Sequence, residues 1–349
     1  MIKSYDGKKI AILGAGVTGK AVARALIQRG AQVVLIDERP HVEVGFTVEH
    51  PDAVDISIFD GAVVSPGWRQ DHPLIIGAIN AGIEILNEID IAWCISREIS
   101  PAQTWLALTG TNGKTTTVEM VAAMLQGAGL KAVACGNLGD TVIDAVTSHE
   151  KFDILVLELS SFQLYWLKQA CFESVAILNI AQDHLDWHGD FDSYARAKLS
   201  ILDRAKIAIL NADDREIVER AQSWRGRKVF FTLKVPEAGE IGVVENLLVD
   251  RAFVSDFQEA SMIATLGDIV PTLPHSVSNA MAAAGLDGAA VQADPRHLAP
   301  PPVGVGRPSR LEEAPLVPER DVWGARRTGA ERTRPPLRAV RAAAPRSDS

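Results

Sequence analysis

The residues best suited to chemistry lie between positions 105 and 120. The apolar run Trp105–Leu108 is typical of a buried strand, and a glycine turn and the start of a helix follow it. The turn and the first helical residues are Gly110, Thr111, Asn112, Gly113, Lys114, Thr115 and Thr116. Glycines let backbone N–H groups approach phosphate oxygens, and the positive end of a helix dipole favours an anion. The segment therefore predicts a triphosphate site in which Lys114 reaches the β- and γ-phosphates and Thr115 ligates Mg²⁺. The longer form of this loop has a further glycine, where the chain has Leu108.

A carboxylate follows the next strongly apolar run. Residues 154–157 read Ile-Leu-Val-Leu and end in Glu158, which is typical of a central strand covered on both faces. Ligands of open α/β sheets bind at the carboxyl ends of the strands. Glu158 is either a second anchor for Mg²⁺ beside the triphosphate loop or an ordinary polar residue at a strand exit.

Two further segments contain candidate metal ligands. Two histidines and two aspartates fall within residues 183–188, including His184, and form either a metal site or a solvated turn. In the helix expected over 191–202, Lys198 shares a face with Tyr194 and apolar residues. Such a lysine usually extends its amine toward solvent. Alternatively its pKa is lowered and it reacts, for example with CO₂, to become an anionic metal ligand.

The N-terminal segment has the pattern of a pyrophosphate-binding turn. A strand at Lys9–Leu13 is followed by the turn Gly14–Gly19, with glycines at 14, 16 and 19, and then by a helix. The second strand, at 32–36, ends on Asp37. Taken alone, this fingerprint favours NAD, although the same turn suits any pyrophosphate. An NAD-dependent dehydrogenase would explain neither Lys114 nor Glu158.

The alternation of short strands and helices predicts an α/β fold with parallel sheets. We expect an N-terminal Rossmann-like domain over residues 1–98 and a central P-loop ATPase-type domain over 99–286, with residues 96–103 as a polar linker. Residues 287–349 have a different composition, with ten of the 18 prolines and eleven arginines. They read as an irregular tail, either a natural disordered segment or a gene read in a shifted frame, that does not form a compact domain.

Composition limits the function classes. The net charge of −9 argues against nucleic acid as a partner, and no apolar run is long enough for membrane insertion. The three cysteines have no metal-ligand spacing, which suits a reducing compartment. We expect a cytoplasmic monomer.

Several of these motifs together resemble those of the Mur ligases, the ATP-dependent amide-bond-forming enzymes of peptidoglycan synthesis. The loop Thr109–Thr117 is similar to the family's P-loop, and the string Glu158–Leu164 (E-L-S-S-F-Q-L) looks like that of the members that add D-glutamate. Further support comes from Ser65-Pro66-Gly67, Gly136-Asn137 and residues 211–214.

The resemblance implies a role for each matching residue. ATP would lie on Gly110–Thr116, with Asn279 near the adenine. The first domain would bind the uridine end of UDP-N-acetylmuramoyl-L-alanine, rather than NAD, through Val17, Thr18, Asp37 and Arg39. Asn137 and His184 of the central domain would complete the substrate site. Mg²⁺ would be held by Thr115, Glu158, His184 and Lys198, the last as a carbamylated lysine, and the catalytic residues would be Lys114, Glu158, His184 and Lys198.

The implied reaction joins D-glutamate to the UDP-sugar through an acyl phosphate. Mur ligases also have a third domain, which binds the incoming amino acid, and nothing in residues 287–349 resembles it. We therefore expect the 349-residue chain to ligate weakly or not at all, which a phosphate-release assay with all three substrates tests. A remnant that binds nucleotide and UDP-sugar without turnover is the alternative.

Overall fold

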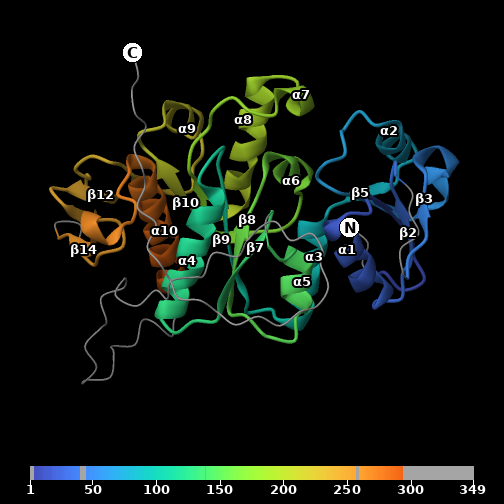
Figure 1. The fold of residues 1–349 in the computed structure, drawn as a ribbon, viewed down its shortest axis with the longest axis horizontal. Helices are drawn as coiled ribbons and strands as arrows, with labels where there is room; N and C mark the ends of the chain where they lie inside the picture. Colours follow the sequence, from blue (N-terminus) through green and yellow to red (C-terminus); the bar gives the residue numbers. More distant parts are fainter. Residues whose placement is uncertain (1–3, 40–44, 138, 257–258, 294–349) are drawn as a thin grey trace, which may run out of the picture. The chain divides into compact units, whose positions relative to one another are not determined.

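The computed structural model describes residues 4–39, 45–137, 139–256 and 259–293 (Figure 1). Within them the strands form two sheets, one of five strands in the order β3-β2-β1-β4-β5 and one of nine in the order β14-β13-β12-β11-β10-β9-β6-β8-β7. The predicted α/β class with parallel sheets is confirmed. The predicted tail from 294 onward lies outside the described residues.

The five-stranded sheet is parallel throughout and contains the strands predicted for the first domain. Its strands are β1 Lys9–Leu13, β2 Gln32–Ile36, β3 Val48–Glu49, β4 Gly61–Val64 and β5 Glu84–Leu86, and its helices are α1 Val17–Ile27 and α2 Pro73–Asn80, with short 3₁₀ turns at Pro51–Ala53 and Ile56–Ile58. Residues from both faces of β1 are buried, which explains its nearly continuous apolar run.

The nine-stranded sheet is parallel from β7 to β12 and antiparallel at β13 and β14. Its strands are β6 Thr104–Thr109, β7 Ala132–Gly136, β8 Ile154–Glu158, β9 Phe172–Ile177, β10 Ala205–Asn211, β11 Arg227–Phe231, β12 Glu240–Val244, β13 Leu247–Asp250 and β14 Ser261–Thr265. The accompanying helices are α4 Lys114–Gly127, α5 Val142–Thr147, α6 Ser161–Trp166, α7 Leu185–His188, α8 Phe191–Leu199, α9 Arg215–Arg220 and α10 Pro274–Ala293, with 3₁₀ turns at Ser200–Arg204 and Leu266–Asp268. Strands β6 and β8 lie side by side, so the triphosphate loop and Glu158 leave the sheet at the same edge.

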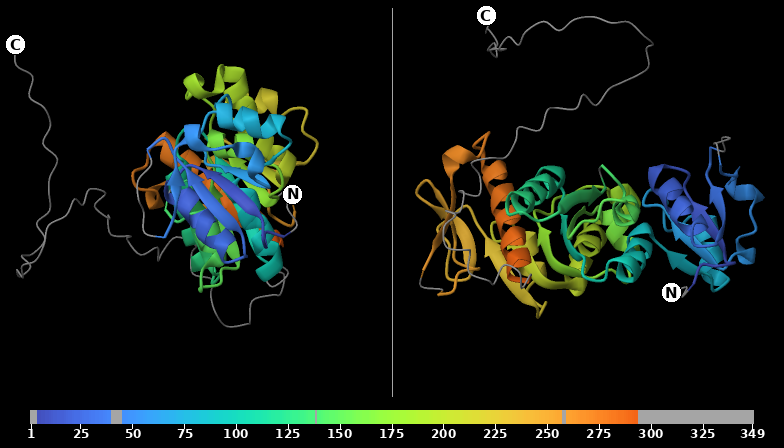
Figure 2. Two further views of the ribbon diagram at one scale, coloured as in Figure 1. Left: turned by 90° about the vertical axis from the view of Figure 1, so that its right-hand side faces the viewer. Right: turned by 90° about the horizontal axis from the view of Figure 1, so that it is seen from below.

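The last helix is longer than the sequence pattern indicates. Helix α10 packs beside α4 against the nine-stranded sheet (Figures 1 and 2) and continues to Ala293, beyond the predicted boundary at 286. Ala289 and Ala290 are buried, so alanines beyond residue 286, where the composition changes, still belong to the hydrophobic core. At Gly285 a side chain would lie 2.6 Å from Ile209, which explains the need for a small residue there.

The predicted polar linker at 96–103 is wrong in its first half. Helix α3 extends from Glu88 to Ile99. Ser96 and Gln103 are buried, because the Ser96 hydroxyl and the Trp105 indole both donate to the Gln103 side-chain oxygen. Polar residues that satisfy one another can be buried, so polarity alone does not mark a linker.

The first turn of α3 joins the two sheets. The buried Asp90 carboxylate accepts the backbone N–H groups of residues 168, 169 and 170, which follow α6. The Asn87 amide donates to Asp90 and to the Trp166 carbonyl. Three backbone donors on one carboxylate make this junction sensitive to the loss of Asp90, because each would be left unsatisfied.

Glu88 gives the same junction a dependence on pH. Burial raises the pKa of Glu88 to about 7, although its carboxylate accepts the Ile143 N–H at 3.1 Å. The folded protein therefore binds more protons at Glu88 than the unfolded chain does between pH 4.5 and 7. This contribution to stability is complete at low pH and is lost as the pH rises through 7.

We predict that Glu88→Gln flattens the dependence of stability on pH over this interval. The measurement is the urea midpoint of wild type and variant at several pH values between 4.5 and 7. Glutamine keeps the acceptor for Ile143 and removes the titration. Parallel curves for the two proteins would contradict the assignment.

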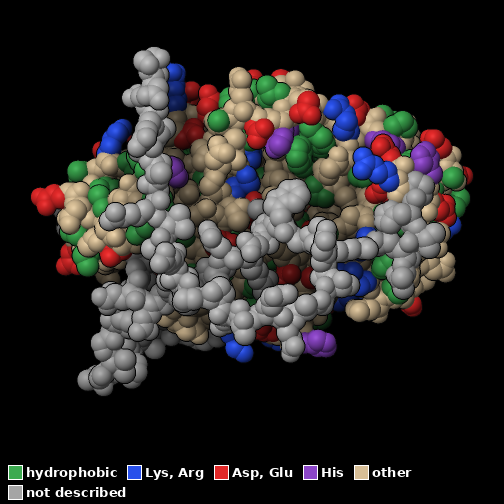
Figure 3. Space-filling model, in the orientation of Figure 1, with side chains coloured by type: hydrophobic (Ala, Val, Ile, Leu, Met, Phe, Trp, Pro, Cys, Tyr) green, Lys and Arg blue, Asp and Glu red, His purple; other side chains and the backbone are tan. Residues whose placement is uncertain are grey.

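Two further observations concern the surface and the helices. On the face drawn in Figure 3, Lys and Arg side chains lie interspersed with Asp and Glu. No helix in the described ranges is both long and apolar enough to cross a bilayer.

Candidate functional site: a phosphate loop, a buried carboxylate and a buried lysine

The predicted phosphate loop connects β6 to α4. Gly113 directly precedes α4 with a φ of +83°, and glycine has no side chain with which to cap the helix. The first N–H groups of α4 therefore remain available to an anion at the positive end of the helix dipole. The Lys114 ammonium donates to the Thr111 carbonyl at 3.0 Å and so lies folded over the loop.

Gly113 also faces a residue from the far end of the domain. A Cβ on Gly113 would lie 2.5 Å from the Asn279 side-chain oxygen. Asn279 is buried in the second turn of α10, so the structure brings this predicted adenine contact against the phosphate loop.

Asn179 holds the same loop from the next strand. Its side-chain oxygen accepts the Asn112 N–H at 2.8 Å, and its amide donates to the Asn112 carbonyl at 3.0 Å. Thr111 is held by the Tyr194 hydroxyl at 2.9 Å. Sequence reasoning gave Asn179 no role of its own, although a polar residue two positions after the buried strand β9 was the available signal.

Glu158 ends β8 and is 2% exposed. One of its carboxylate oxygens accepts the Thr115 hydroxyl at 2.9 Å, and the other accepts the Asn137 amide at 3.0 Å. The structure thus brings together three predicted residues from three different segments. A carboxylate beside a hydroxyl is a set of hard oxygen donors that suits Mg²⁺, so these residues fit the predicted metal.

Lys198 does not extend to solvent. Its side chain is 2% exposed, and its amine donates to the Gly110 carbonyl at 2.8 Å and to the Thr109 hydroxyl at 3.4 Å. Burial, reinforced by the positive charge of Lys114, lowers the pKa of Lys198 to about 7. A substantial fraction of a buried amine with this pKa is neutral near pH 7, which makes it a nucleophile.

His184 lies at the start of the four-residue helix α7, in the left-handed region with a φ of 50°. Its ring lies 3.4 Å from the Asp183 carboxylate and 4.7 Å, between centroids, from Phe162. Across the described residues, no group of three or more His, Cys, Asp or Glu side chains converges as a metal site. The described structure therefore does not bring the four side chains at 183, 184, 186 and 188 together as such a group.

The N-terminal turn is built as a close approach of backbone. Gly14 has a φ of +109°, and a Cβ there would lie 2.7 Å from the Ser65 hydroxyl. The Asp37 carboxylate accepts the backbone N–H groups of Ala15 and Arg39. Val17 is 72% exposed and Thr18 half-buried, so the rim of the turn is open to a ligand.

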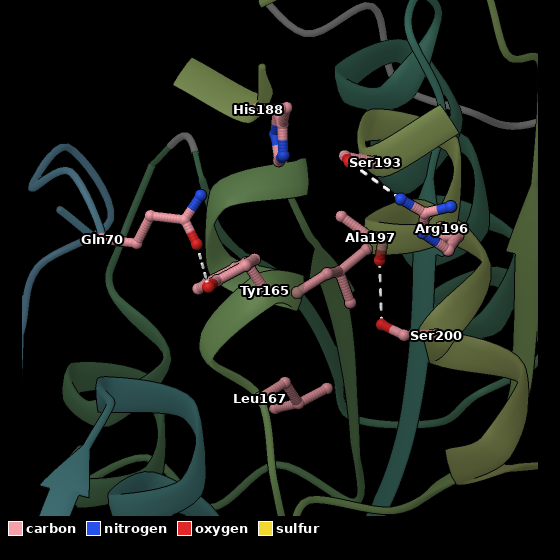
Figure 4. A pocket seen from close by; sticks show the side chains of 9 residues that line it. Gln70, Tyr165, Leu167, His188, Ser193, Arg196, Ala197 and Ser200 are labelled. Carbon is pink, nitrogen blue, oxygen red and sulfur yellow. Dashed lines mark hydrogen bonds between the residues drawn. The ribbon is translucent and has the colours of Figure 1, made fainter. Parts of the chain in front are cut away.

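A separate cavity of about 390 Å³ lies between α6 and α8 (Figure 4). Its lining includes Gln70, Tyr165, His188 and Arg196. Arg196 precedes Lys198 by two residues and points from a different face of α8, because consecutive helical residues are about 100° apart. The cavity is therefore distinct from the phosphate loop.

Comparisons with known proteins identify two matching regions of the chain. The profile described as the MurD-like N-terminal domain of Mur ligases matches residues 8–87, and the Mur ligase middle domain matches residues 108–286. The UDP-N-acetylmuramoylalanine–D-glutamate ligase of Thermobifida fusca is 45% identical over an alignment of 298 positions, and the match covers 80% of this chain and 63% of that protein. The enzyme of the same name from Streptomyces coelicolor is 40% identical over 309 aligned positions, and the match covers 82% of this chain and 64% of that protein. The chain thus spans less than two thirds of the length of these relatives.

Among solved structures, the UDP-N-acetylmuramate:L-alanyl-γ-D-glutamyl-meso-diaminopimelate ligase from Neisseria meningitides superimposes with a TM-score of 0.52 at 15% identity. The match covers 88% of this chain and 97% of that one. At this identity, the match shows a similarity of fold alone.

Proposed function

Because this chain belongs to the Mur ligase family, we propose that its described region binds UDP-N-acetylmuramoyl-L-alanine and MgATP and phosphorylates the terminal carboxylate of the sugar substrate. The observation that carries the proposal is the convergence of Thr115, Glu158 and Lys198 on one phosphate loop. A dehydrogenase site needs neither of these two contacts.

ATP binds with its phosphates on residues 110–116. The uncapped N-terminus of α4 and Lys114 meet the β- and γ-phosphates, and Asn279 lies beside the loop for contact with the nucleotide. The bond between Lys114 and the Thr111 carbonyl is exchanged for bonds to phosphate when the nucleotide enters.

Thr115, Glu158, His184 and Lys198 hold Mg²⁺, which supplies charge neutralisation between two anions that must approach each other. Lys198 serves as a carbamate. Its neutral amine attacks CO₂, forms an N–C bond and releases one proton, which converts a buried amine into a carboxylate-like ligand.

The UDP-sugar lies on the Gly14–Gly19 turn, with Val17, Thr18, Asp37 and Arg39 around the uridine. Asn137 and His184 lie toward its peptide end. Asn137 is bonded to Glu158, so a substrate contact at Asn137 adjoins the metal-binding carboxylate.

The proposed reaction has two steps. A carboxylate oxygen of the L-alanyl group attacks the γ-phosphorus, the bond to ADP breaks, and an acyl phosphate results. The amine of D-glutamate then attacks the carbonyl carbon, loses a proton and displaces phosphate. D-glutamate is proposed as the acceptor because the relatives quoted above carry it in their names.

The three cysteines of the described part are free thiols. We place the enzyme in the cytoplasm, as a monomer that acts in peptidoglycan synthesis.

Trapping with hydroxylamine tests the first half of this reaction without an amino-acid acceptor. The protein is incubated with UDP-N-acetylmuramoyl-L-alanine, MgATP and hydroxylamine, and acyl hydroxamate and ADP are quantified together. We expect equal amounts of both, dependent on the UDP-sugar. Binding of both ligands without hydroxamate would favour a non-catalytic binding protein.

A further inference from the structure

The loop between β4 and α2, residues 65–72, contacts two parts of the proposed substrate site: the Gly14–Gly19 turn and the segment that contains His184. Its first residue donates to the Leu13 carbonyl at 3.0 Å, and the Ser65 side chain and the Trp68 indole nitrogen both lie against Gly14. Any ligand on the Gly14–Gly19 turn therefore adjoins this loop.

Arg69 extends from this loop to the segment that contains His184. One of its terminal nitrogens donates to the Asp186 carbonyl at 2.6 Å, two residues after His184. Its other two donors bind the Asp71 carboxylate at 3.0 and 2.9 Å. The bidentate pair with Asp71 fixes the plane of the guanidinium, so that its remaining nitrogen points at Asp186.

Helix α7 receives little support from its own backbone. It has four residues and follows the left-handed His184, and among the residues that the structure describes no side chain caps its N-terminus. One turn of helix is marginal by itself, because nucleation costs more than a few backbone bonds return. A charged donor on the Asp186 carbonyl therefore influences where α7, and His184 with it, lies.

A second contact of the same loop supports this connection. The Tyr165 hydroxyl donates to the Gln70 side chain (Figure 4), and the Tyr165 ring meets Trp187 of α7 edge to face at 5.1 Å. Two consecutive loop residues thus contact α7, one directly and one through α6.

We infer that Arg69 is a positioning residue that couples the Gly14–Gly19 turn to His184. A UDP-sugar bound on that turn would then reorient α7. This inference rests on the proposed function, which places the UDP-sugar on that turn. The Arg69–Asp71 pair is half exposed, with side-chain exposures of 51% and 60%, so its contribution to overall stability is small. The pair instead orients the Arg69 guanidinium toward the Asp186 carbonyl.

The chain offers a matched control for Arg69. Arg24 of α1 forms an ion pair with Asp144 of α5 at 3.3 Å and is similarly exposed, at 52%. This pair also joins an element of the N-terminal sheet to the middle domain, yet it contacts neither the 65–72 loop nor α7. Loss of Arg24 removes a comparable surface charge without affecting the proposed coupling.

Two tryptophans report the two ends of the connection. The Trp68 indole lies against Gly14, and the buried Trp187 lies in α7. The ¹⁵N-labelled indole signals of the full chain are assigned with Trp68→Phe and Trp187→Phe and then followed during titration with UDP-N-acetylmuramoyl-L-alanine. In the wild type we expect both signals to shift along one binding curve.

In Arg69→Gln the Trp68 signal still shifts, whereas the response of Trp187 falls by about fivefold or more. Arg69→Lys restores it only in part, because an ammonium cannot hold Asp71 bidentately while it donates to Asp186. Arg24→Gln behaves as the wild type. Circular dichroism establishes that each variant is folded.

The outcomes separate this inference from the proposed function. A Trp187 response in Arg69→Gln equal to the wild-type response, with Trp68 also responding, overturns the role of Arg69 alone. If the Trp68 signal of the wild type does not shift when the UDP-sugar is added, the proposed substrate site is wrong. The inferred coupling is then wrong as well.

Discussion

Glu158→Gln lowers the rate of acyl hydroxamate formation by about 10²- to 10³-fold, the range seen when one electrostatic contact to a transition state is lost. Glutamine fills the same space and can still accept the Thr115 hydroxyl, so the fold is preserved. What it loses is the negative charge beside the phosphate loop. Mg²⁺ then no longer tightens ADP binding, which isothermal titration with and without the metal measures directly.

The matched control for Glu158 is Glu119→Gln. Glu119 lies on α4, the helix that begins at the phosphate loop, and its side chain is exposed. We expect wild-type hydroxamate formation from this variant. If Glu158→Gln keeps a rate within tenfold of the wild type and the same response to Mg²⁺, Glu158 is not a metal ligand.

Lys198→Arg is expected to cause a loss of similar size, again about 10²- to 10³-fold. Arginine keeps a positive charge near the Gly110 carbonyl but has no neutral amine near pH 7, so it forms no carbamate. With ¹³C-labelled bicarbonate the wild-type protein gives a carbamate carbonyl signal, and the variant gives none. Because the pKa of Lys198 is about 7, that signal grows as the pH rises through 7.

Lys206→Arg controls for the exchange of lysine for arginine. Lys206 is exposed and forms an ion pair with Glu173 at 2.6 Å. Its replacement leaves both the carbamate signal and the rate unchanged. An undiminished carbamate signal in Lys198→Arg would place the modified amine elsewhere, and full activity of that variant would remove Lys198 from the reaction.

The local parts of the site could be predicted from the sequence. An apolar run, a glycine turn and Lys114-Thr115 specify a strand, loop and helix whatever surrounds them, and Glu158 had to leave its strand at the carboxyl edge. The contact between Thr115 and Glu158 followed once both strands were placed in one parallel sheet.

Contacts between distant segments could not be predicted in the same way. Nothing local in Asp90 indicates that it accepts three N–H groups almost eighty residues away, and nothing in Arg69 indicates a bond to Asp186. The buried pair Ser96 and Gln103 reads as a linker because composition does not reveal which polar groups satisfy one another. Helix α10 passes the predicted boundary because alanines fit equally well in a core helix and in an irregular segment.

The central claim is that the carboxylate of the UDP-sugar attacks the γ-phosphate of ATP on this phosphate loop. The most direct measurement uses UDP-N-acetylmuramoyl-L-alanine with ¹⁸O in its terminal carboxylate, MgATP and hydroxylamine as acceptor. Attack at the carbonyl carbon releases phosphate that keeps the bridging oxygen, so ³¹P NMR should show one ¹⁸O in each phosphate formed. Phosphate without label would mean that water attacks ATP directly, and the proposed activation of the carboxylate would be wrong.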